Sequence, residues 1–429
     1  MSDTIFALAS AQGRAGVSVV RISGPEALNI ARDMCGVLPD IGTFGVRPVV
    51  APDGAQIDTA LVLTFAGPRS FTGEDTAELH LHGSVAVVRA VLETLSAADG
   101  ARMAEAGEFT RRALENGKLD LAQVEGLAEL IDAETEAQRR QALRVLSGEL
   151  GQKVEIWRTK LIRSAALIEA TIDFADEDVP VDVTPEVNAL LKDVVFDLQR
   201  EIDGSFVAER IRSGFEVAIV GAPNVGKSTL LNALAGRDAA ITSEIAGTTR
   251  DIIEVRMDLG GLPVTLLDTA GLRNSEDTVE SIGIARALSR AATADIRVVL
   301  KRPEDDLALD MFDGDITLRP KIDAPDGIVD GISGLTGHGI PELLSRLKST
   351  LLDRSASAGL ATHERHRSAM VNAVRYILAA RNILTLGPDE YDIAAEEIRF
   401  AIRSLEALIG RIDVENLLDE IFSSFCVGK

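Results

Sequence analysis

Residues 221–228, Gly-Ala-Pro-Asn-Val-Gly-Lys-Ser, have the types and spacing of a loop that binds phosphate groups. An apolar run at 215–220 predicts a strand just before this loop, and residues 228–234 predict a helix just after it. In such a loop, backbone N–H groups surround the phosphates and the helix N-terminus adds its dipole. Lys227 can reach the terminal phosphates, and the Ser228 hydroxyl can bind Mg²⁺. We therefore expect a nucleotide site rather than a structural glycine turn.

Two segments further along the chain supply what nucleotide hydrolysis needs. Residues 268–271, Asp-Thr-Ala-Gly, follow a predicted strand, so Asp268 can hold Mg²⁺ through water and Gly271 can offer its N–H to the γ-phosphate. Residues 247–251, Gly-Thr-Thr-Arg-Asp, lie between the two and place a second hydroxyl, that of Thr249, near Mg²⁺. The three segments, in this order, predict hydrolysis of a nucleoside triphosphate.

The residues that would read the base follow a weaker pattern. GTPases usually carry Asn-Lys-x-Asp, whose aspartate accepts hydrogen bonds from guanine in a way that adenine cannot match. The candidate in this chain is Pro-Lys-Ile-Asp at 320–323, which keeps Asp323 but has proline in place of asparagine. Ser333 follows where a Ser-Ala-Lys motif would begin, with Gly334 in place of alanine. We expect guanine preference with reduced affinity.

The group that orients the attacking water is not where Ras-like enzymes place it. Leu272 occupies the position of the usual glutamine, and leucine cannot orient water. The acidic stretch that follows offers Glu276, Asp277 and Glu280 as substitutes. A solvated acidic loop is the competing interpretation for each of them.

Histidine and cysteine give weaker signals. His80 and His82 alternate along a predicted strand and could share one face as metal ligands, but no third ligand is evident, so we favour hydrogen-bonded histidines. Cys35 and Cys426 are far apart and match no metal-ligand spacing, which indicates neither a disulfide framework nor a zinc site. A buried or merely terminal cysteine is the interpretation we favour for Cys426.

The elements that must position these residues fall into stretches with three different residue patterns. Short β-rich segments separated by Gly/Pro turns fill the first ~115 residues, a proline-free run with helical spacing fills 119–174, and strands alternate with helices from 215 to about 352. Helical texture returns near 363–386, 389–408 and 413–425. The fold class we expect is multidomain: an α+β N-terminal domain, a discontinuous helical domain and an inserted α/β P-loop (Ras-like) domain. The predicted domains are residues 1–117, 118–213, 214–352 and 353–429.

Composition sets outer limits on function. The chain has 429 residues, 46% of them hydrophobic, which suits a folded protein of two or three domains. Its formal net charge of −23 disfavours direct gripping of a nucleic acid, so another protein should hold any RNA substrate. The N-terminus has no signal-peptide pattern and no apolar run is long enough to span a bilayer, so we expect a cytoplasmic protein without membrane association.

A family resemblance is carried by short segments spread along the chain. Those before the phosphate loop lie at 13–17 (Gly-Arg-Ala-Gly-Val), 21–24 (Arg-Ile-Ser-Gly), 70–75 (Ser-Phe-Thr-Gly-Glu-Asp), 107–110 (Gly-Glu-Phe-Thr) and 118–123 (Lys-Leu-Asp-Leu-Ala-Gln). The phosphate loop and residues 268–271 follow, and the chain finishes on Cys-Val-Gly-Lys at 426–429. This ordered set resembles the MnmE (TrmE) family of bacterial tRNA-modification GTPases along nearly the whole length.

The resemblance implies an architecture and a reaction. The N-terminal domain would bind folate and form a homodimer, and the G domain would be inserted into the helical domain. Family members act with the FAD-dependent protein MnmG (GidA), in a heterotetramer through which tRNA is bound. They build carboxymethylaminomethyl or aminomethyl groups on C5 of uridine 34, using NADH and 5,10-methylenetetrahydrofolate or 5-formyltetrahydrofolate.

The resemblance also assigns residues by matching position. Glu280 would orient the attacking water, which places it above Glu276 and Asp277. Folate would be held by Arg21, Glu78, Lys118 and Lys429; Mg²⁺ by Ser228 and Thr249; and K⁺ by Asn224, Ser243, Ile245 and Thr248. GTP would be bound by Asn224, Val225, Gly226, Lys227, Ser228, Thr229, Ser243, Glu244, Ile245, Ala246, Gly247, Thr248, Thr249, Asp268, Thr269, Ala270, Gly271, Lys321, Asp323 and Ser333.

Two other functions stay open at this point. The first is a GTP-dependent binding switch, such as a ribosome-assembly factor, which a KH module or a second P-loop would support; the sequence shows neither. The second is a degenerate GTPase that binds folate and scaffolds a complex without turnover, which Pro320 keeps in play.

Overall fold

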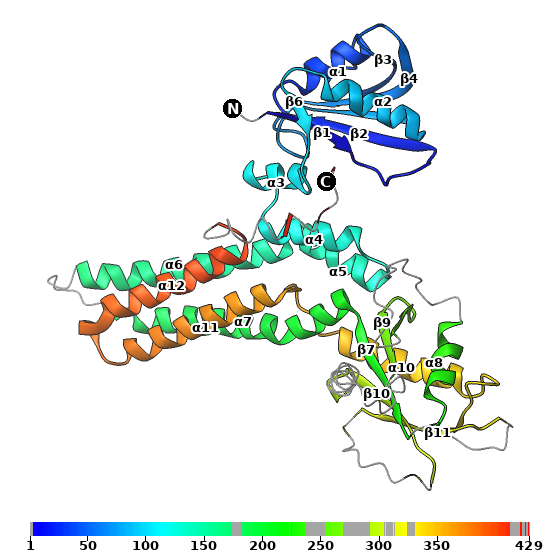
Figure 1. Cartoon of the computed structure of the whole chain (residues 1–429). Coiled ribbons are helices and arrows are strands. Elements are labelled where there is room, and N and C mark those ends of the chain that lie inside the picture. Colours follow the sequence, from blue (N-terminus) through cyan, green and yellow to red (C-terminus); the bar gives the residue numbers. More distant parts are fainter. Residues whose placement is uncertain are drawn as a thin grey trace, which may run out of the picture. The chain divides into compact units, whose positions relative to one another are not determined.

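A computed structural model describes residues 3–173, 182–222, 224–236, 254–268, 292–303, 305, 312, 314–323, 331–411, 421–422, 425 and 428 (Figure 1). The chain forms two compact units. The first unit is Met1–Ala128 together with Glu406–Lys429, and the second is Glu129–Leu405. Each unit has its own sheet.

The sheet of the first unit has six strands in the order β3-β4-β5-β2-β1-β6. Its neighbours are antiparallel except for β1 and β6, which are parallel. The strands are β1 (Thr4–Leu8), β2 (Val17–Ser23), β3 (Phe44–Val50), β4 (Gln56–Phe65), β5 (Thr76–His82) and β6 (Ala101–Met103). Helices α1 (Ala27–Cys35) and α2 (Val85–Ser96) cover an apolar core that includes Phe6, Ile22, Leu79 and Leu95. This unit is the α+β domain that the β-rich texture predicts.

Residues near the end of the chain pack into the same first unit. Helices α3 (Glu108–Glu115) and α4 (Leu121–Ile131) follow β6, and Phe422 and Phe425 are buried beside Val124 of α4. Gly428 passes so close to the end of β1 that a Cβ atom there would lie 2.1 Å from the Leu8 carbonyl oxygen. The C-terminal segment is therefore part of the N-terminal domain's structure.

Long helices make up part of the second unit. Helices α6, α7, α11 and α12 run side by side (Figure 1), around buried side chains such as Trp157, Leu198 and Ile377. Their bounds, with those of α5 and the short 3-10 helix η1, are α5 (Glu136–Leu146), α6 (Glu149–Asp173), α7 (Thr184–Ser213), α11 (Glu364–Leu384), η1 (Pro388–Glu390) and α12 (Tyr391–Leu408). The proline-free run contains three helices, α4 to α6. Thr135 caps the start of α5, and Gly148, with a φ of 84°, separates α5 from α6.

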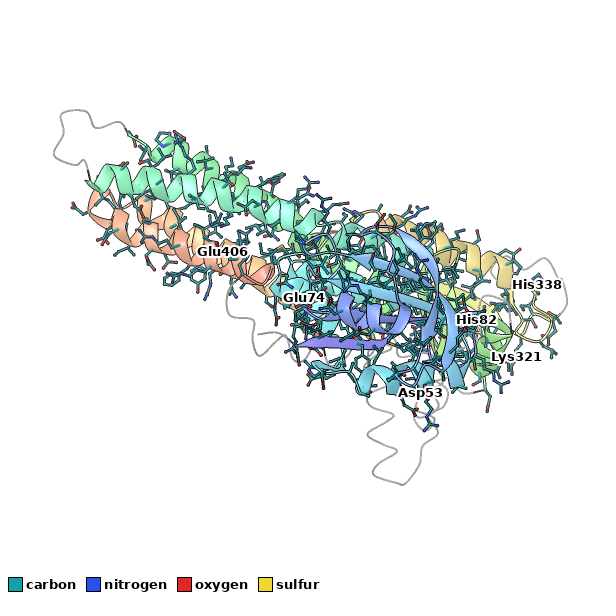
Figure 2. The ribbon with its side chains drawn as sticks, turned by 90° about the horizontal axis from the view of Figure 1, so that it is seen from above. Asp53, Glu74, His82, Lys321, His338 and Glu406 are labelled. Carbon is teal, nitrogen blue, oxygen red and sulfur yellow. The ribbon has the colours of Figure 1, made fainter. Side chains whose placement is uncertain are left out.

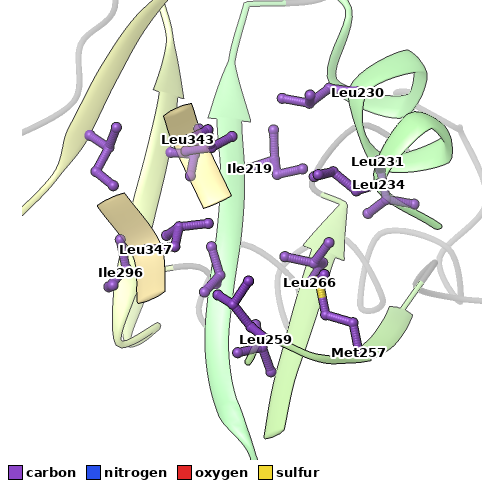
Figure 3. Close-up of a cluster of buried hydrophobic side chains, with 14 of the residues drawn as sticks. Ile219, Leu230, Leu231, Leu234, Met257, Leu259, Leu266, Ile296, Leu343 and Leu347 are labelled. Atoms are coloured by element: carbon purple, nitrogen blue, oxygen red, sulfur yellow. The ribbon is translucent and has the colours of Figure 1, made fainter. Parts of the chain in front are cut away.

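The α/β domain lies between α7 and α11 in the sequence. Its sheet has the order β12-β11-β10-β7-β9-β8, parallel throughout except between β8 and β9. The strands are β7 (Phe215–Gly221), β8 (Glu254–Asp258), β9 (Pro263–Asp268), β10 (Ile296–Leu300), β11 (Ile316–Pro320) and β12 (Gly331–Ile332). Helices α8 (Lys227–Ala235) and α10 (Ile340–Ser355) pack leucines such as Leu230, Leu231 and Leu343 against the sheet (Figure 3). This is the doubly wound sheet that the alternating texture predicts.

The expected multidomain fold class is thus confirmed, and the predicted helices near 363–386 and 389–408 are α11 and α12. Most of the helix expected at 413–425 lies outside the described residues. The domain boundaries at 117, 213 and 352 stay predictions.

Candidate functional site

The phosphate loop joins β7 to α8 in the centre of the second sheet. Gly226 is the N-cap of α8, and the helix begins at Lys227 with Ser228 in its first turn. The N-terminus of α8 therefore faces the loop with its free N–H groups. Asn224 has a φ of 58° and is exposed, so it projects from the loop with a left-handed backbone.

Lys227 is held inside this loop. Its Nζ donates hydrogen bonds to the carbonyl oxygens of Gly221 (2.8 Å) and Ala222 (3.0 Å), and the residue is only 6% exposed. These two bonds satisfy the buried ammonium group and hold it at the centre of the loop. These donors fit the phosphates of a nucleoside triphosphate, because one cation and several backbone N–H groups lie together in the loop.

Asp268 is the last residue of β9, whose register pairs it with Ile219 of β7. The carboxyl ends of parallel neighbours meet at one edge of a sheet, so Asp268 and the phosphate loop share that edge. The structure thus brings these two predicted elements together. The other predicted phosphate-side and metal-binding residues, Ser243 to Thr249, Thr269 to Gly271 and Glu280, lie outside the described residues.

The predicted base-reading residues lie on two loops, after β11 and after β12. Ser333 Oγ donates to Asp323 Oδ1 at 2.7 Å, and it accepts from the backbone N–H groups of Leu335 and Thr336. Lys321 has a φ of 61°, and its loop is visible together with the one carrying His338 (Figure 2). The Ser333 hydroxyl therefore orients the carboxylate that sequence reasoning assigned to guanine.

Gly334 has a structural reason that sequence reasoning missed. A Cβ atom at this position would lie 2.7 Å from the backbone nitrogen of Leu230 in α8. The loop after β12 thus lies directly against the first turns of the phosphate-loop helix, closer than alanine would allow. The only sign of this contact in the sequence was that glycine stands where the Ser-Ala-Lys motif has alanine.

A second polar cluster lies in the N-terminal domain. Arg21 of β2 faces Glu78 of β5 in the register of the sheet, and Arg21 Nε donates to Glu78 Oε1 at 2.9 Å. The Arg21 guanidinium also lies 5.3 Å from the ring centre of Phe71 and 5.7 Å from that of Phe109. Phe109 is fully buried, whereas Phe71 is partly exposed. A cation and a carboxylate beside an exposed aromatic edge fit a flat heterocycle with N–H donors and carboxylate groups, as in folate.

Of the other two residues assigned to folate, the structure describes only Lys118. Lys118 Nζ donates to the carbonyl oxygen of Pro68 at 2.8 Å, in the loop that carries Phe71. Lys429 lies outside the described residues. Its neighbour Gly428 lies beside Leu8 of β1, and Ala7 of β1 pairs with Arg21. The chain end is therefore close to the strand that carries Arg21.

Sequence reasoning missed a charged network beneath this cluster. Glu108 accepts hydrogen bonds from Arg102 Nη1 (2.8 Å), Arg102 Nη2 (2.6 Å) and Arg112 Nη2 (2.9 Å). Burial raises the pKa of Glu108, but the Arg102 bonds, the Glu105 N–H and Arg112 outweigh it, so the pKa lies below its usual value. Arg112 also contacts Glu74, labelled in Figure 2.

His80 and His82 lie beside carboxylates, and Cys35 is buried. His82 Nδ1 lies 2.8 Å from Asp58 Oδ1, and His80 Nε2 lies 3.4 Å from Glu78 Oε2, as expected for hydrogen-bonded histidines. No group of three or more His, Cys, Asp or Glu residues in the described parts of the chain could hold a metal ion. Cys35 is buried, which raises the pKa of its thiol to about 11. Among the described residues no helix is long and apolar enough to cross a membrane.

Comparisons with known proteins cover the whole chain. The family model described as "MnmE helical domain" matches residues 121–426, and the one described as "GTP-binding protein TrmE N-terminus" matches residues 4–118. Two curated relatives, both called "tRNA modification GTPase MnmE", are 67% identical over 427 residues (Roseobacter denitrificans) and 61% identical over 429 residues (Ruegeria pomeroyi). Each match covers 100% of both chains. A crystal structure of Era with MgGDPNP and 16S ribosomal RNA nucleotides is 27% identical, with a TM-score of 0.25, over 32% of this chain and 56% of that one.

Proposed function

The chain belongs to the MnmE family and is a tRNA modification GTPase, and from this we infer that it serves modification of C5 of the wobble uridine, U34. The observation that carries the GTPase chemistry is the position of Lys227 and Asp268 at one edge of the sheet, at the ends of β7 and β9. GTP turnover at this edge would drive the addition of a carboxymethylaminomethyl or aminomethyl group.

The nucleotide site, as we propose it, has three parts. The loop at 224–229 and residues 243–249 bind the phosphates, with Mg²⁺ on Ser228 and Thr249 and K⁺ on Asn224, Ser243, Ile245 and Thr248. Asp268 and residues 269–271 meet the Mg²⁺ and the γ-phosphate, and Glu280 orients the attacking water. Lys321, Asp323 and Ser333 bind guanine, supported by the Ser333–Asp323 hydrogen bond of 2.7 Å.

The one-carbon donor, a 5,10-methylene or 5-formyl tetrahydrofolate, would bind at Arg21, Glu78, Lys118 and Lys429. The Arg21–Glu78 pair beside Phe71 and Phe109 supports this proposal, because its polar and aromatic groups suit a pterin ring. The bound folate would supply the carbon that is transferred to the uridine.

We propose that the chain acts in the cytoplasm as a homodimer, with the FAD-dependent protein MnmG in a heterotetramer. The net charge of −23 supports a partner that supplies most of the RNA-binding surface, because an acidic chain repels a polyanion. NADH and FAD would act on the partner protein.

The test is mass spectrometry of wobble nucleosides in tRNA from a strain that lacks this gene. We expect unmodified C5 of U34 in the tRNAs that normally carry the group, and recovery when the gene is returned on a plasmid. Unchanged U34 nucleosides in the deletion strain would refute the wobble-uridine proposal. That result would not bear on the assignment of the chain as a GTPase.

A further inference from the structure

The first turns of α5 contact three separate segments that lead into or belong to the α/β domain. These are the last turn of α7, just before β7; the turn between β8 and β9; and the segment that joins α10 to α11. The hydrogen bonds run from Ala137 N to the Gly261 oxygen (2.9 Å), from Gln138 Nε2 to the Arg212 oxygen (3.0 Å) and from Gln141 Nε2 to the Gly359 oxygen (2.7 Å). One short helix therefore joins both connections of the domain to its β8–β9 hairpin.

The two connections are held firmly. Gln138 is the N3 residue of a capping box, and its Oε1 accepts from the backbone N–H of Thr135 at 3.0 Å, so its amide is fixed in orientation. Gln141 is only 5% exposed, and loss of its bond would leave the Gly359 carbonyl without that donor in a buried place. These two hydrogen bonds therefore fix α5 to both connections.

The contact with the hairpin is of a different kind. It is a backbone hydrogen bond to a turn formed by Gly260 and Gly261, with φ values of 62° and 94°. Ala137 also packs against the core that contains Leu259 and Leu262, which flank the turn. Of the three contacts, this is the one that reaches a strand ending at the nucleotide site, because β9 follows the turn.

The hairpin reaches from α5 to the nucleotide site. Strand β9 starts at Pro263, close to the turn, and ends at Asp268, beside the phosphate loop. Its six residues span about 20 Å at about 3.3 Å each. In GTPases the segments that meet the γ-phosphate change their conformation on hydrolysis. A shift at the Asp268 end of a hydrogen-bonded strand would move the turn at its other end.

We propose that the first turn of α5 is a latch, which holds the β8–β9 turn in one nucleotide state and releases it in the other. Gln138 and Gln141 keep the latch fixed to the connections, so that the hairpin moves relative to the helices. The helical domain then senses GTP hydrolysis through α5. This inference rests on the GTPase activity of the family and not on the proposed folate or potassium residues.

A disulfide can report the latch directly. The Cβ atom of Glu136 lies 3.6 Å from the Cβ position of Gly261, a separation that suits a disulfide. In the full chain carrying Glu136→Cys and Gly261→Cys, we expect the rate of cross-linking to differ by about tenfold between GDP and a non-hydrolysable GTP analogue. Each single variant is the control. A Cys426→Ser background removes one of the two native thiols, and the other, Cys35, is buried. Equal rates in the two nucleotides, or no cross-link in either, would overturn the proposal.

A matched proline pair tests the latch without oxidation. Ala137→Pro removes the N–H that donates to Gly261, at a position in the first helical turn where proline is tolerated. Glu136→Pro, one residue earlier, keeps that N–H. We expect Ala137→Pro to retain GTP binding and hydrolysis but to lose most tRNA modification, whereas Glu136→Pro retains both. Equal modification by the two variants would contradict the latch, and loss of GTP binding in both would report a folding defect, which the disulfide rates then resolve.

Discussion

Asp323 and Ser333 belong to different loops, and a hydrogen bond joins them in the base site that we propose. The Ser333 hydroxyl accepts two backbone N–H groups and donates to Asp323 Oδ1, so the serine is fixed and in turn fixes the carboxylate. The other carboxylate oxygen is then the natural acceptor for guanine N–H groups. In the base site that we propose, Asp323 is therefore held in place even though Pro320 stands where asparagine is usual.

Replacing Pro320 by asparagine is expected to tighten GTP binding. Pro320 is buried at the end of β11, and its ring offers no donor to the base or to the phosphate loop. A restored side-chain hydrogen bond contributes ~0.5–1.5 kcal/mol, or roughly threefold to tenfold in affinity. Equilibrium titration with a fluorescent GTP analogue measures this. Asp323→Ala is the control and should weaken binding with either residue at 320. An unchanged affinity in Pro320→Asn would mean that residues 320–323 are not the base-reading motif.

Residue types were predictable at this scale, but contacts between distant residues were not. Lys227, Asp268 and Asp323 were assigned from short motifs, because each motif has a fixed place after a strand. The close approach of Gly334 to α8 and the contact of Arg112 with Glu74 join residues distant in sequence, and no spacing rule connects them. The first was visible only as an unexplained glycine.

At the scale of elements, the C-terminal segment is held to β1 by a contact that only glycine permits. Gly428 has a φ of 103°, and a Cβ atom would lie 2.1 Å from the Leu8 oxygen. We expect Gly428→Ala to displace the chain end and weaken folate binding by about tenfold or more, with GTP hydrolysis unchanged. Isothermal titration with 5-formyltetrahydrofolate measures the first effect and phosphate release the second.

The control for this variant is Gly13→Ala. Gly13 has a similar φ of 115°, but a Cβ atom there would meet nothing within 4 Å. The Gly13→Ala substitution therefore introduces comparable backbone strain in the same unit without a steric clash. Equal folate binding by the two alanine variants would mean that the position of the chain end does not matter for the folate site.

The network at the start of α3 makes the N-terminal domain sensitive to acid. Because the folded-state pKa of Glu108 lies below its usual value, the charged form stabilises the fold at neutral pH, and this stabilisation is lost as pH falls through the folded-state pKa. Glu108→Gln should cost about 1.5–3 kcal/mol at pH 7, with the difference from the parent shrinking below pH ~4.

Hydrogen exchange of peptides from β1 and α3, with variant and parent compared at each pH, measures this effect. Glu93→Gln is the control, because its ion pair with Arg89 is exposed on α2 and contributes little. A Glu108→Gln variant that exchanges like the parent at pH 7 would show that the network is not stabilising.

Helices were predicted more accurately than sheets at this scale. The spacing of apolar residues and the prolines place α11 and α12 within a few residues of their observed bounds. The order β3-β4-β5-β2-β1-β6 depends on pairings between strands far apart in the chain, which local pattern does not encode.

At the scale of the whole molecule, the texture of the sequence predicted an α/β domain between two helical stretches. The structure has this order, with β7 following α7 and α11 following α10. The residue pattern did not predict that the C-terminal segment joins the first unit. It also did not predict that α5 contacts both connections of the α/β domain. Both features come from tertiary contacts of loops and helix ends, where hydrophobic periodicity carries no signal.

The last prediction concerns how two copies of the molecule cooperate in hydrolysis. Phosphoryl transfer needs positive charge near the β- and γ-phosphates, which an arginine finger often supplies at a gain of 10³–10⁵ in rate. The family resemblance implies that no arginine finger acts here, and we propose that K⁺ bound at Asn224 supplies the positive charge instead. Because ordering of residues 243–248 around the ion would bring two G domains face to face, GTPase activity should rise steeply with protein concentration in K⁺ but not in Na⁺ at the same ionic strength.

Two variants of Asn224 separate the ion from the backbone. Asn224 has a φ of 58°, which asparagine tolerates better than alanine, so Asn224→Ala removes the side-chain oxygen and also strains the loop. Asn224→Gly removes the oxygen but accepts the same backbone. If the side chain binds K⁺, both variants lose potassium activation in steady-state assays. If it only maintains the loop conformation, Asn224→Gly keeps full activation while Asn224→Ala loses it, and the potassium role of this residue is then wrong.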